Sequence, residues 1–220
     1  MLTRGDLKSL FSYMVDDLSF GYFTETQVNM WLNLAQKEVQ KLLLQAGENF
    51  YMVPVETVTV ANQADYALPN DFMKLHRLEF VLSGSGVNEN RMMLFPITLN
   101  QQGALGNANS NPMGYSMGKD RFTLYPTPDS VKTLRLYYSP RVADMTQDSD
   151  EPDCPDEYAE LIAIMAAEYA FIKDDRAPST LLEKKRSYLE LMKQTSEDRK
   201  EDVPRPVVMV DDEFFGPAMF

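Results

Sequence analysis

The chain has 220 residues, enough for one large or two small domains, and its 44% hydrophobic content excludes global disorder. A formal net charge of −12 argues against a basic groove for reading DNA. One cysteine (Cys154) and one histidine (His76) exclude an intrachain disulfide and a Cys/His zinc site. A Cys–His nucleophilic pair has no support beyond these counts.

No membrane segment is predicted. The longest uninterrupted apolar run, residues 161–167, is far shorter than the roughly 20 residues that a membrane helix needs. The first ten residues lack the apolar run of a signal peptide. We therefore expect a soluble protein or a part of a soluble assembly, with no cofactor.

Two helices are predicted first. Thr3 with Asp6 resembles a capping box, and Thr24 with Gln27 gives a second one. The first apolar stripe is Leu7, Leu10, Phe11, Met14, Val15 and Leu18. The second is Val28, Trp31, Leu32, Ala35, Val39, Leu42, Leu43 and Ala46. Gly47 stands at a C-cap, so we expect an antiparallel helical pair.

Residues 50–142 favour strands. Valines in residues 53–60, and alternating apolar residues in 75–82 and 134–138, predict extended structure. Residues 115–117 and 121–125 flank Gly118, Lys119 and Asp120, which predicts a hairpin. The region should hold five or six short strands in a small sandwich or barrel.

The C-terminal part returns to helix. Residues 144–160 carry eight acidic side chains and no Lys or Arg. Asp153 is a candidate N-cap and Pro155 fits the first turn of an apolar helix over 158–171. A second amphipathic helix opens at Pro178 and Ser179, and beyond Thr195 the chain becomes polar.

The predicted fold class is α+β: a helical bundle formed by N- and C-terminal helices, with an inserted small antiparallel β domain and an extended C-terminal arm. The predicted parts are a first bundle half (1–49), the β domain (50–142), an acidic loop with the second bundle half (143–195), and the arm (196–220). An insertion explains how helices interrupted by ninety residues share one core.

Catalytic and metal motifs are weak. Residues 114–118 match G-x-S-x-G around Ser116, but the nucleophile elbow needs a following helix and a later histidine, whereas His76 lies upstream. We expect a turn-rich hairpin there and a half-buried, hydrogen-bonded His76. The acidic residues of 144–160 lack EF-hand spacing, which favours a solvated loop over a cation site or a charged oligomer surface. No catalytic, cofactor-binding or metal-binding residue is predicted.

The C-terminal arm carries the predicted partner-binding residues, for a partner protein or a neighbouring subunit. They are Val207, Val208, Val210, Phe214, Phe215 and Phe220. Burying each phenylalanine contributes about 1.5–3 kcal/mol, so these side chains favour an arm that docks on a partner. The alternatives are a disordered tail or one that wraps onto its own domain.

The order of these pieces resembles tailed-bacteriophage head-to-tail connector adaptors, especially those of short-tailed phages. The resemblance rests on residues 23–26, 31–36, 66–72, 121–126, 134–138 and 155–158. It implies a structural virion protein, not an enzyme, that is assembled in the host cytoplasm and placed at the portal vertex. It also implies a ring, usually of twelve copies, that joins the portal protein to the tail nozzle and other tail proteins. DNA would pass through without specific binding.

Three other interpretations remain open. The chain could be a tail-nozzle or head-completion component of the same virion, a small serine hydrolase using Ser116, or a non-viral binding module with a β domain.

Overall fold

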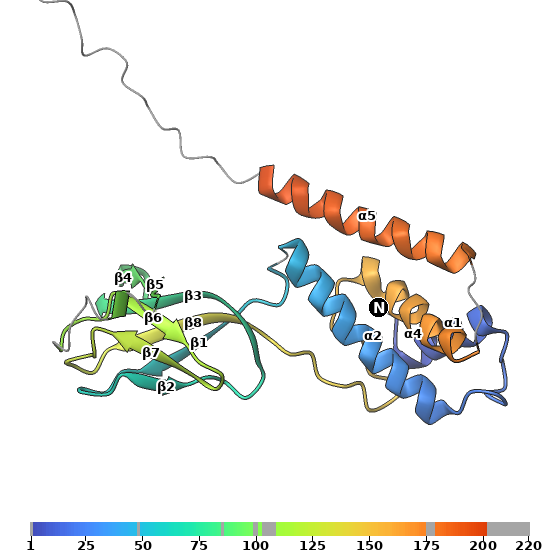
Figure 1. Ribbon diagram of the computed structural model, residues 1–220, viewed down its shortest axis with the longest axis horizontal. Helices are drawn as coiled ribbons and strands as arrows, with labels where there is room; N and C mark the ends of the chain where they lie inside the picture. Colours follow the sequence, from blue (N-terminus) through green and yellow to red (C-terminus); the bar gives the residue numbers. More distant parts are fainter. Residues whose placement is uncertain are drawn as a thin grey trace, which may run out of the picture.

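In the computed structural model, helices gather at one end of the molecule and strands at the other (Figure 1). Each end has its own cluster of buried apolar residues. The predicted α+β class is therefore confirmed. The structure describes residues 2–47, 49–84, 86–98, 101–102, 109–174 and 179–201.

Helix α1 (Arg4–Val15) begins at the predicted capping box. Thr3 Oγ1 accepts the N–H of Asp6 at 3.2 Å, and the Asp6 carboxylate accepts the N–H of Thr3 at 2.9 Å. The helix ends at Asp16, whose φ of 59° turns the chain aside. Leu18 therefore lies beyond the helix and is 63% exposed, so its prediction as part of the buried stripe is wrong.

Helix α2 (Glu25–Ala46) also begins and ends where the sequence predicts. The backbone N–H of Gln27 donates to Thr24 Oγ1 at 3.4 Å, and the Gln27 side chain returns a bond to the N–H of Thr24. Gly47 closes the helix with a left-handed φ of 91°. Both α1 and α2 pack mainly against a third helix, α4, so the bundle is centred there and not on the predicted pair.

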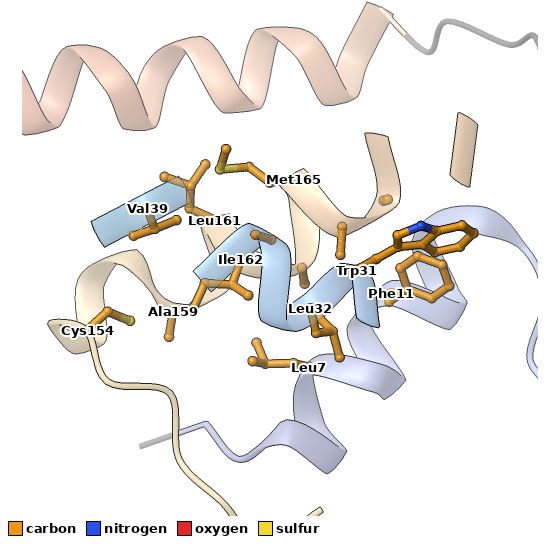
Figure 2. Packing of buried hydrophobic residues seen from close by; sticks show 14 of the residues in the cluster. Leu7, Phe11, Trp31, Leu32, Val39, Cys154, Ala159, Leu161, Ile162 and Met165 are labelled. Carbon is orange, nitrogen blue, oxygen red and sulfur yellow. The ribbon is translucent and has the colours of Figure 1, made fainter. Parts of the chain in front are cut away.

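Helix α4 (Ala159–Lys173) is the centre of the bundle because apolar residues occupy every face. Figure 2 shows Leu161, Ile162 and Met165 among side chains of α1 and α2. Its buried middle is formed by Leu161, Ile162, Ala163, Ile164, Met165, Ala166 and Ala167. An uninterrupted run of this kind leaves α4 no face for solvent over these residues.

The chain enters α4 through a 3-10 turn, Asp156–Tyr158. Pro155 precedes this turn, where its fixed φ suits a helix start. The predicted N-cap at Asp153 is wrong: Pro155 and Tyr158 hold the two cap positions, and neither makes a side-chain cap bond. The backbone carbonyl of Asp153 instead accepts the Tyr51 hydroxyl at 2.9 Å.

Helix α5 (Ser179–Glu201) lies over α4 and α2 (Figure 1). The Met192 side chain of α5 is buried against the bundle core, and the Lys185 ammonium of α5 pairs with Glu168 of α4 at 2.6 Å. The helix continues past Thr195, where the sequence predicts a change to polar, non-helical chain. Among the described residues, no helix has the length and apolar content that a bilayer crossing requires.

The strands form two four-stranded sheets. The first has the order β1 (Val53–Val58), β8 (Thr133–Pro140), β3 (Phe72–Ser83) and β4 (Asn90–Met93), all antiparallel. The predicted strands of 53–60, 75–82 and 134–138 are β1, β3 and β8. Leu134, Leu136 and Tyr138 are buried, as their alternation predicts.

The second sheet has the order β2 (Asp65–Ala67), β7 (Arg121–Tyr125), β6 (Gly114–Met117) and β5 (Phe95–Pro96). β6 and β7 form the predicted hairpin, whereas β5 pairs with β6 in parallel. Strands of two to four residues such as β2, β4 and β5 carry too little pattern for a sequence prediction. The two sheets enclose one core of Tyr66, Leu78, Phe80, Leu94, Phe122, Leu124, Leu134 and Leu136.

Three amide side chains on one face of α2 hold the chain where it returns from β8 to the bundle. Asn33 bonds both backbone groups of Met145: its Nδ2 donates to the carbonyl at 3.2 Å, and its Oδ1 accepts the N–H at 2.8 Å. Gln36 Nε2 donates to the carbonyl of Ala143 at 2.8 Å. These side chains give the backbone of the returning segment the hydrogen-bonding partners that a neighbouring strand would otherwise provide.

Gln40 completes this amide ladder at the boundary between the two ends of the molecule. Its Nε2 donates to the carbonyl of Pro140 at 2.7 Å, and its Oε1 accepts the N–H of Val142 at 3.3 Å. Residues 33, 36 and 40 share one face because they lie three and four positions apart. The ladder thus fixes the last residue of β8 against α2.

We expect Gln40→Ala to lower the free energy of unfolding by about 2 kcal/mol, because it leaves two buried backbone groups without partners. Gln40 is 1% exposed, whereas Gln45 on the same helix is exposed and provides the matched control. Urea unfolding of both alanine variants measures the difference. Equal losses in the two variants would contradict a structural role for the ladder.

Candidate functional site

The predicted partner-binding residues of the arm lie outside the described residues. They are Val207, Val208, Val210, Phe214, Phe215 and Phe220, and their role stays a prediction. The other sequence candidates, Ser116, His76 and the acidic segment 144–160, fall within the described part of the chain.

Ser116 lies in strand β6 and is followed by a turn and strand β7, not by a helix. The G-x-S-x-G match therefore does not form a nucleophile elbow, in which the serine sits between a strand and a helix. Ser116 Oγ lies 3.5 Å from the hydroxyl of Tyr125. The predicted hairpin accounts for this motif.

His76 and Cys154 have structural surroundings. His76 Nε2 lies 2.7 Å from the hydroxyl of Ser139, as expected for a hydrogen-bonded histidine, and burial together with Lys74 lowers its pKa. Burial raises the pKa of the Cys154 thiol to about 12. The thiol is therefore protonated at neutral pH and is a poor nucleophile.

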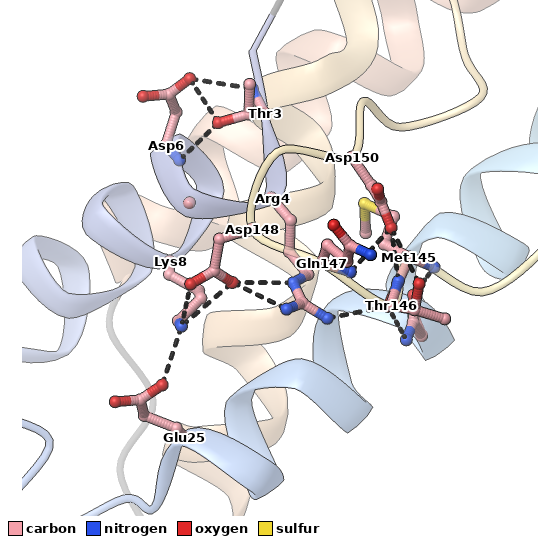
Figure 3. A network of polar contacts seen from close by, with 12 residues as sticks. Thr3, Arg4, Asp6, Lys8, Glu25, Met145, Thr146, Gln147, Asp148 and Asp150 are labelled. Atoms are coloured by element: carbon pink, nitrogen blue, oxygen red, sulfur yellow. Dashed lines mark hydrogen bonds and ion pairs between the residues drawn. The ribbon is translucent and has the colours of Figure 1, made fainter.

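The acidic segment is bound to the start of α1 instead of forming a free loop (Figure 3). One carboxylate oxygen of Asp148 accepts bonds from Arg4 Nε at 3.0 Å and Arg4 Nη2 at 2.8 Å. The Lys8 ammonium lies 3.1 Å from the second oxygen and 2.9 Å from Glu25 of α2. Arg4 and Lys8 are only 8% and 7% exposed, so Asp148 compensates two nearly buried cations.

Backbone groups strengthen the same contact. The N–H of Arg4 donates to the carbonyl of Asp150 at 2.7 Å, and the N–H of Gly5 donates to that of Asp148 at 2.9 Å. The first-turn amides of α1, which lack partners inside the helix, are satisfied by this segment. A Cβ at Gly5 would lie 3.3 Å from the Asp148 carbonyl oxygen, which favours glycine there.

Two further carboxylates of the segment have internal partners. Asp150 accepts the N–H groups of Thr146 at 2.6 Å and Gln147 at 2.8 Å, which closes a turn. Asp144 pairs with Lys37 of α2 at 2.6 Å. Asp144 and Asp148 stay more than half exposed at their side chains, as expected for a solvated loop, although both are paired within the protein. No cluster in the described chain groups three residues able to hold a metal ion.

The contacts of this segment shift each pKa toward the charged form of its group, so the pKa values of the aspartates fall and that of Lys8 rises. Hydrogen bonds from Lys8 and Arg4 lower the pKa of Asp148, and backbone N–H groups of Gln147 and Thr146 lower that of Asp150. Burial opposes the charged form of Lys8, but its bonds to Glu25 and Asp148 outweigh burial and raise its pKa. All these groups are therefore held in their charged forms at neutral pH.

The described surface also carries an exposed apolar segment that the sequence prediction did not single out. It surrounds strand β1 and comprises Phe50, Met52, Val53, Val55, Val58 and Val60. Valine alternation predicts a strand here, but not that the strand lies at a sheet edge. Exposed apolar residues in such numbers are typical of contact surfaces.

Two buried cores, a hydrogen-bonded connection between them and an exposed apolar edge are typical of a protein that makes contacts through its surface. The family model described as SU10 adaptor protein matches residues 3–209, and the chain belongs to this family. It is therefore a structural adaptor protein of a bacteriophage, a virion component that contacts other virion proteins. The predicted resemblance to phage adaptors is confirmed. The comparison with curated proteins gives no match.

We expect Asp148→Asn to destabilise the fold by about 1–3 kcal/mol, because it removes the counter-charge that Arg4 and Lys8 share and leaves Lys8 with Glu25 alone. This loss is smaller than the loss on breaking a fully buried ion pair, because the Asp148 side chain is 56% exposed and water screens the pair. Glu157→Gln, an exposed carboxylate of the same acidic segment, is the matched control. An equal loss in both variants would contradict this role for Asp148.

Asp148→Asn should also make the free energy of unfolding less dependent on pH below neutrality. Because the folded pKa of Asp148 lies below its ordinary 3.8, its stabilisation is full above that value and is lost as pH falls through the folded pKa. Urea unfolding between pH 7 and pH 2 should therefore show a smaller loss in Asp148→Asn than in the wild type. Parallel curves would contradict the assignment.

Proposed function

We propose that the chain forms a ring between the portal and the tail, and that its copies surround the path of the DNA. The observation that carries this proposal is the family match over residues 3–209, on a fold whose two ends are held in a fixed arrangement. A protein of this kind holds two neighbouring proteins in a fixed relative position. We place the ring at the portal vertex, with twelve copies as in the adaptors that the chain resembles.

In this proposal the chain divides as the sequence predicts. Residues 1–49 and 143–195 form the bundle, and residues 50–142 form an inserted β domain. The two buried clusters support this division, since one consists mainly of bundle residues and the other of residues from 50–142, although Tyr51 and Val142 belong to the bundle cluster. Each end of the molecule then faces a different neighbour, one the portal and the other the tail nozzle or another tail protein.

The C-terminal arm supplies the docking segment. Val207, Val208, Val210, Phe214, Phe215 and Phe220 bind the portal or a neighbouring subunit, because apolar side chains at this density gain from burial. The chain acts by contact and not as an enzyme, and the strand surroundings of Ser116 support this. DNA passes without being held, since a net charge of −12 opposes phosphate binding.

We expect deletion of residues 207–220 to abolish docking and particle assembly while the thermal unfolding midpoint stays unchanged, since the arm follows both cores in sequence. Val87→Ser, at a 96% exposed position in the β part, should assemble normally and serves as the control. Electron microscopy of particles and thermal unfolding of the purified chains give the two readouts. Normal docking by the truncated chain would refute the role of the arm.

Imaging of assembled particles tests the position of the ring. A ring in direct contact with the portal is the expected result. A ring further along the tail would favour a tail-nozzle component, and a stable monomer without portal affinity would favour a binding module of another kind.

A further inference from the structure

Strand β1 is an edge strand with regular geometry. In the first sheet it pairs with β8, and no strand of the described chain flanks its other side. The pairing with β8 runs without a bulge from Val53 opposite Tyr138 to Val58 opposite Thr133. A regular edge of this kind is a ready template for another strand.

The side chains around β1 are exposed on both faces of the sheet. Six large apolar residues within eleven positions are between 37% and 55% exposed: Phe50, Met52, Val53, Val55, Val58 and Val60. Lysines, which commonly protect sheet edges, are absent from residues 50–60. This edge therefore has the character of a surface that is covered in the assembled state.

The hydrogen-bonding parity of β1 shows which backbone groups the edge offers. The N–H of Thr59 donates to the carbonyl of Lys132 at 2.8 Å, so odd-numbered residues of this segment face β8. Residues 54, 56 and 58 then face outward. Pro54 has no N–H, which leaves the donors of Glu56 and Val58 and limits a partner to a short strand.

We propose that residues 207–210 of a neighbouring copy add to this edge as a further strand of the first sheet. This inference rests on the proposed ring and names the surface that part of its arm binds. The segment reads Val-Val-Met-Val, which suits a strand, and Pro206 before it limits its length. A four-residue strand matches the short outward edge that Pro54 leaves.

The remaining arm fits this arrangement. Six peptide steps from Glu201, the last residue of α5, to Val207 span at most about 20 Å, enough to leave the bundle of one copy. The acidic residues 211–213 follow the added strand and stay in water. Phe214, Phe215 and Phe220 remain beyond them for the portal contact. Strand addition supplies main-chain hydrogen bonds, and the exposed valines of β1 supply apolar contact for the valines of the added segment.

Disulfide cross-linking in assembled particles tests the proposal. Full-length chains with Val55→Cys are mixed with full-length chains with Val208→Cys, and native Cys154 does not interfere because it is 2% exposed. We expect linked pairs of two chains, at least tenfold above a control that replaces Val55→Cys with Val131→Cys, at a 67% exposed valine. Linkage at the control level would overturn the proposal. So would a chain carrying both cysteines that links only to itself.

A second measurement reads the backbone directly. Two alternate amides of residues 207–210 would face β1, either 207 and 209 or 208 and 210. Val208→Pro with Met209→Pro removes one amide of either pair, whereas Val208→Thr with Met209→Thr keeps all four. In particles, the amides of Glu56 and Val58 should exchange hydrogen at least tenfold faster with the proline variant than with the threonine variant. Equal exchange would overturn strand addition.

Particle assembly, scored in the same samples, separates this inference from the proposed function. If normal rings form and the cross-link stays at the control level, strand addition fails and the adaptor ring stands. If the wild-type chain forms no ring against the portal, the proposed function fails, and this inference fails with it.

Discussion

The contact between the returning segment, residues 140–150, and the first two helices determines how the rest of the molecule is arranged. The buried residues form two clusters, one per end, and although Met73 of β3 packs against the bundle cluster, apolar packing is not directional enough to orient one end against the other. That task falls to hydrogen bonds from Asn33, Gln36 and Gln40 and to the pairing of Arg4 with Asp148. Polar bonds suit it because their geometry is directional, whereas hydrophobic burial is not.

Some of the acidic residues stabilise the same contact. Asp144, Asp148 and Asp150 are held by cations or by backbone N–H groups of the protein itself. Part of the negative charge therefore stabilises the fold and is not available to line a channel. The exposed carboxylates at positions 151 and 157 also contribute to the net charge of −12.

The apolar surface around β1 is consistent with a protein that contacts other virion proteins. The strand part buries its apolar residues between two small sheets, yet residues 50–60 leave valines and Phe50 in water. Such exposure carries a free-energy cost in an isolated chain and a gain when a neighbour covers it. A fixed body with uncovered edges is consistent with membership of an adaptor family whose work is contact.

Local features of this protein were determined by the sequence alone. The capping boxes at Thr3 and Thr24, the Gly47 helix end and the β6–β7 hairpin depend on residues a few positions apart, so their patterns are readable. The partners of Asp148 and Gln40 lie 100 to 144 positions away, and polar residues on helix faces or in acidic loops carry no local sign of them. Whether a valine-rich strand is central or at an edge likewise depends on strand order. Only the tertiary structure decided these features, because they arise from surfaces that meet after the chain has folded.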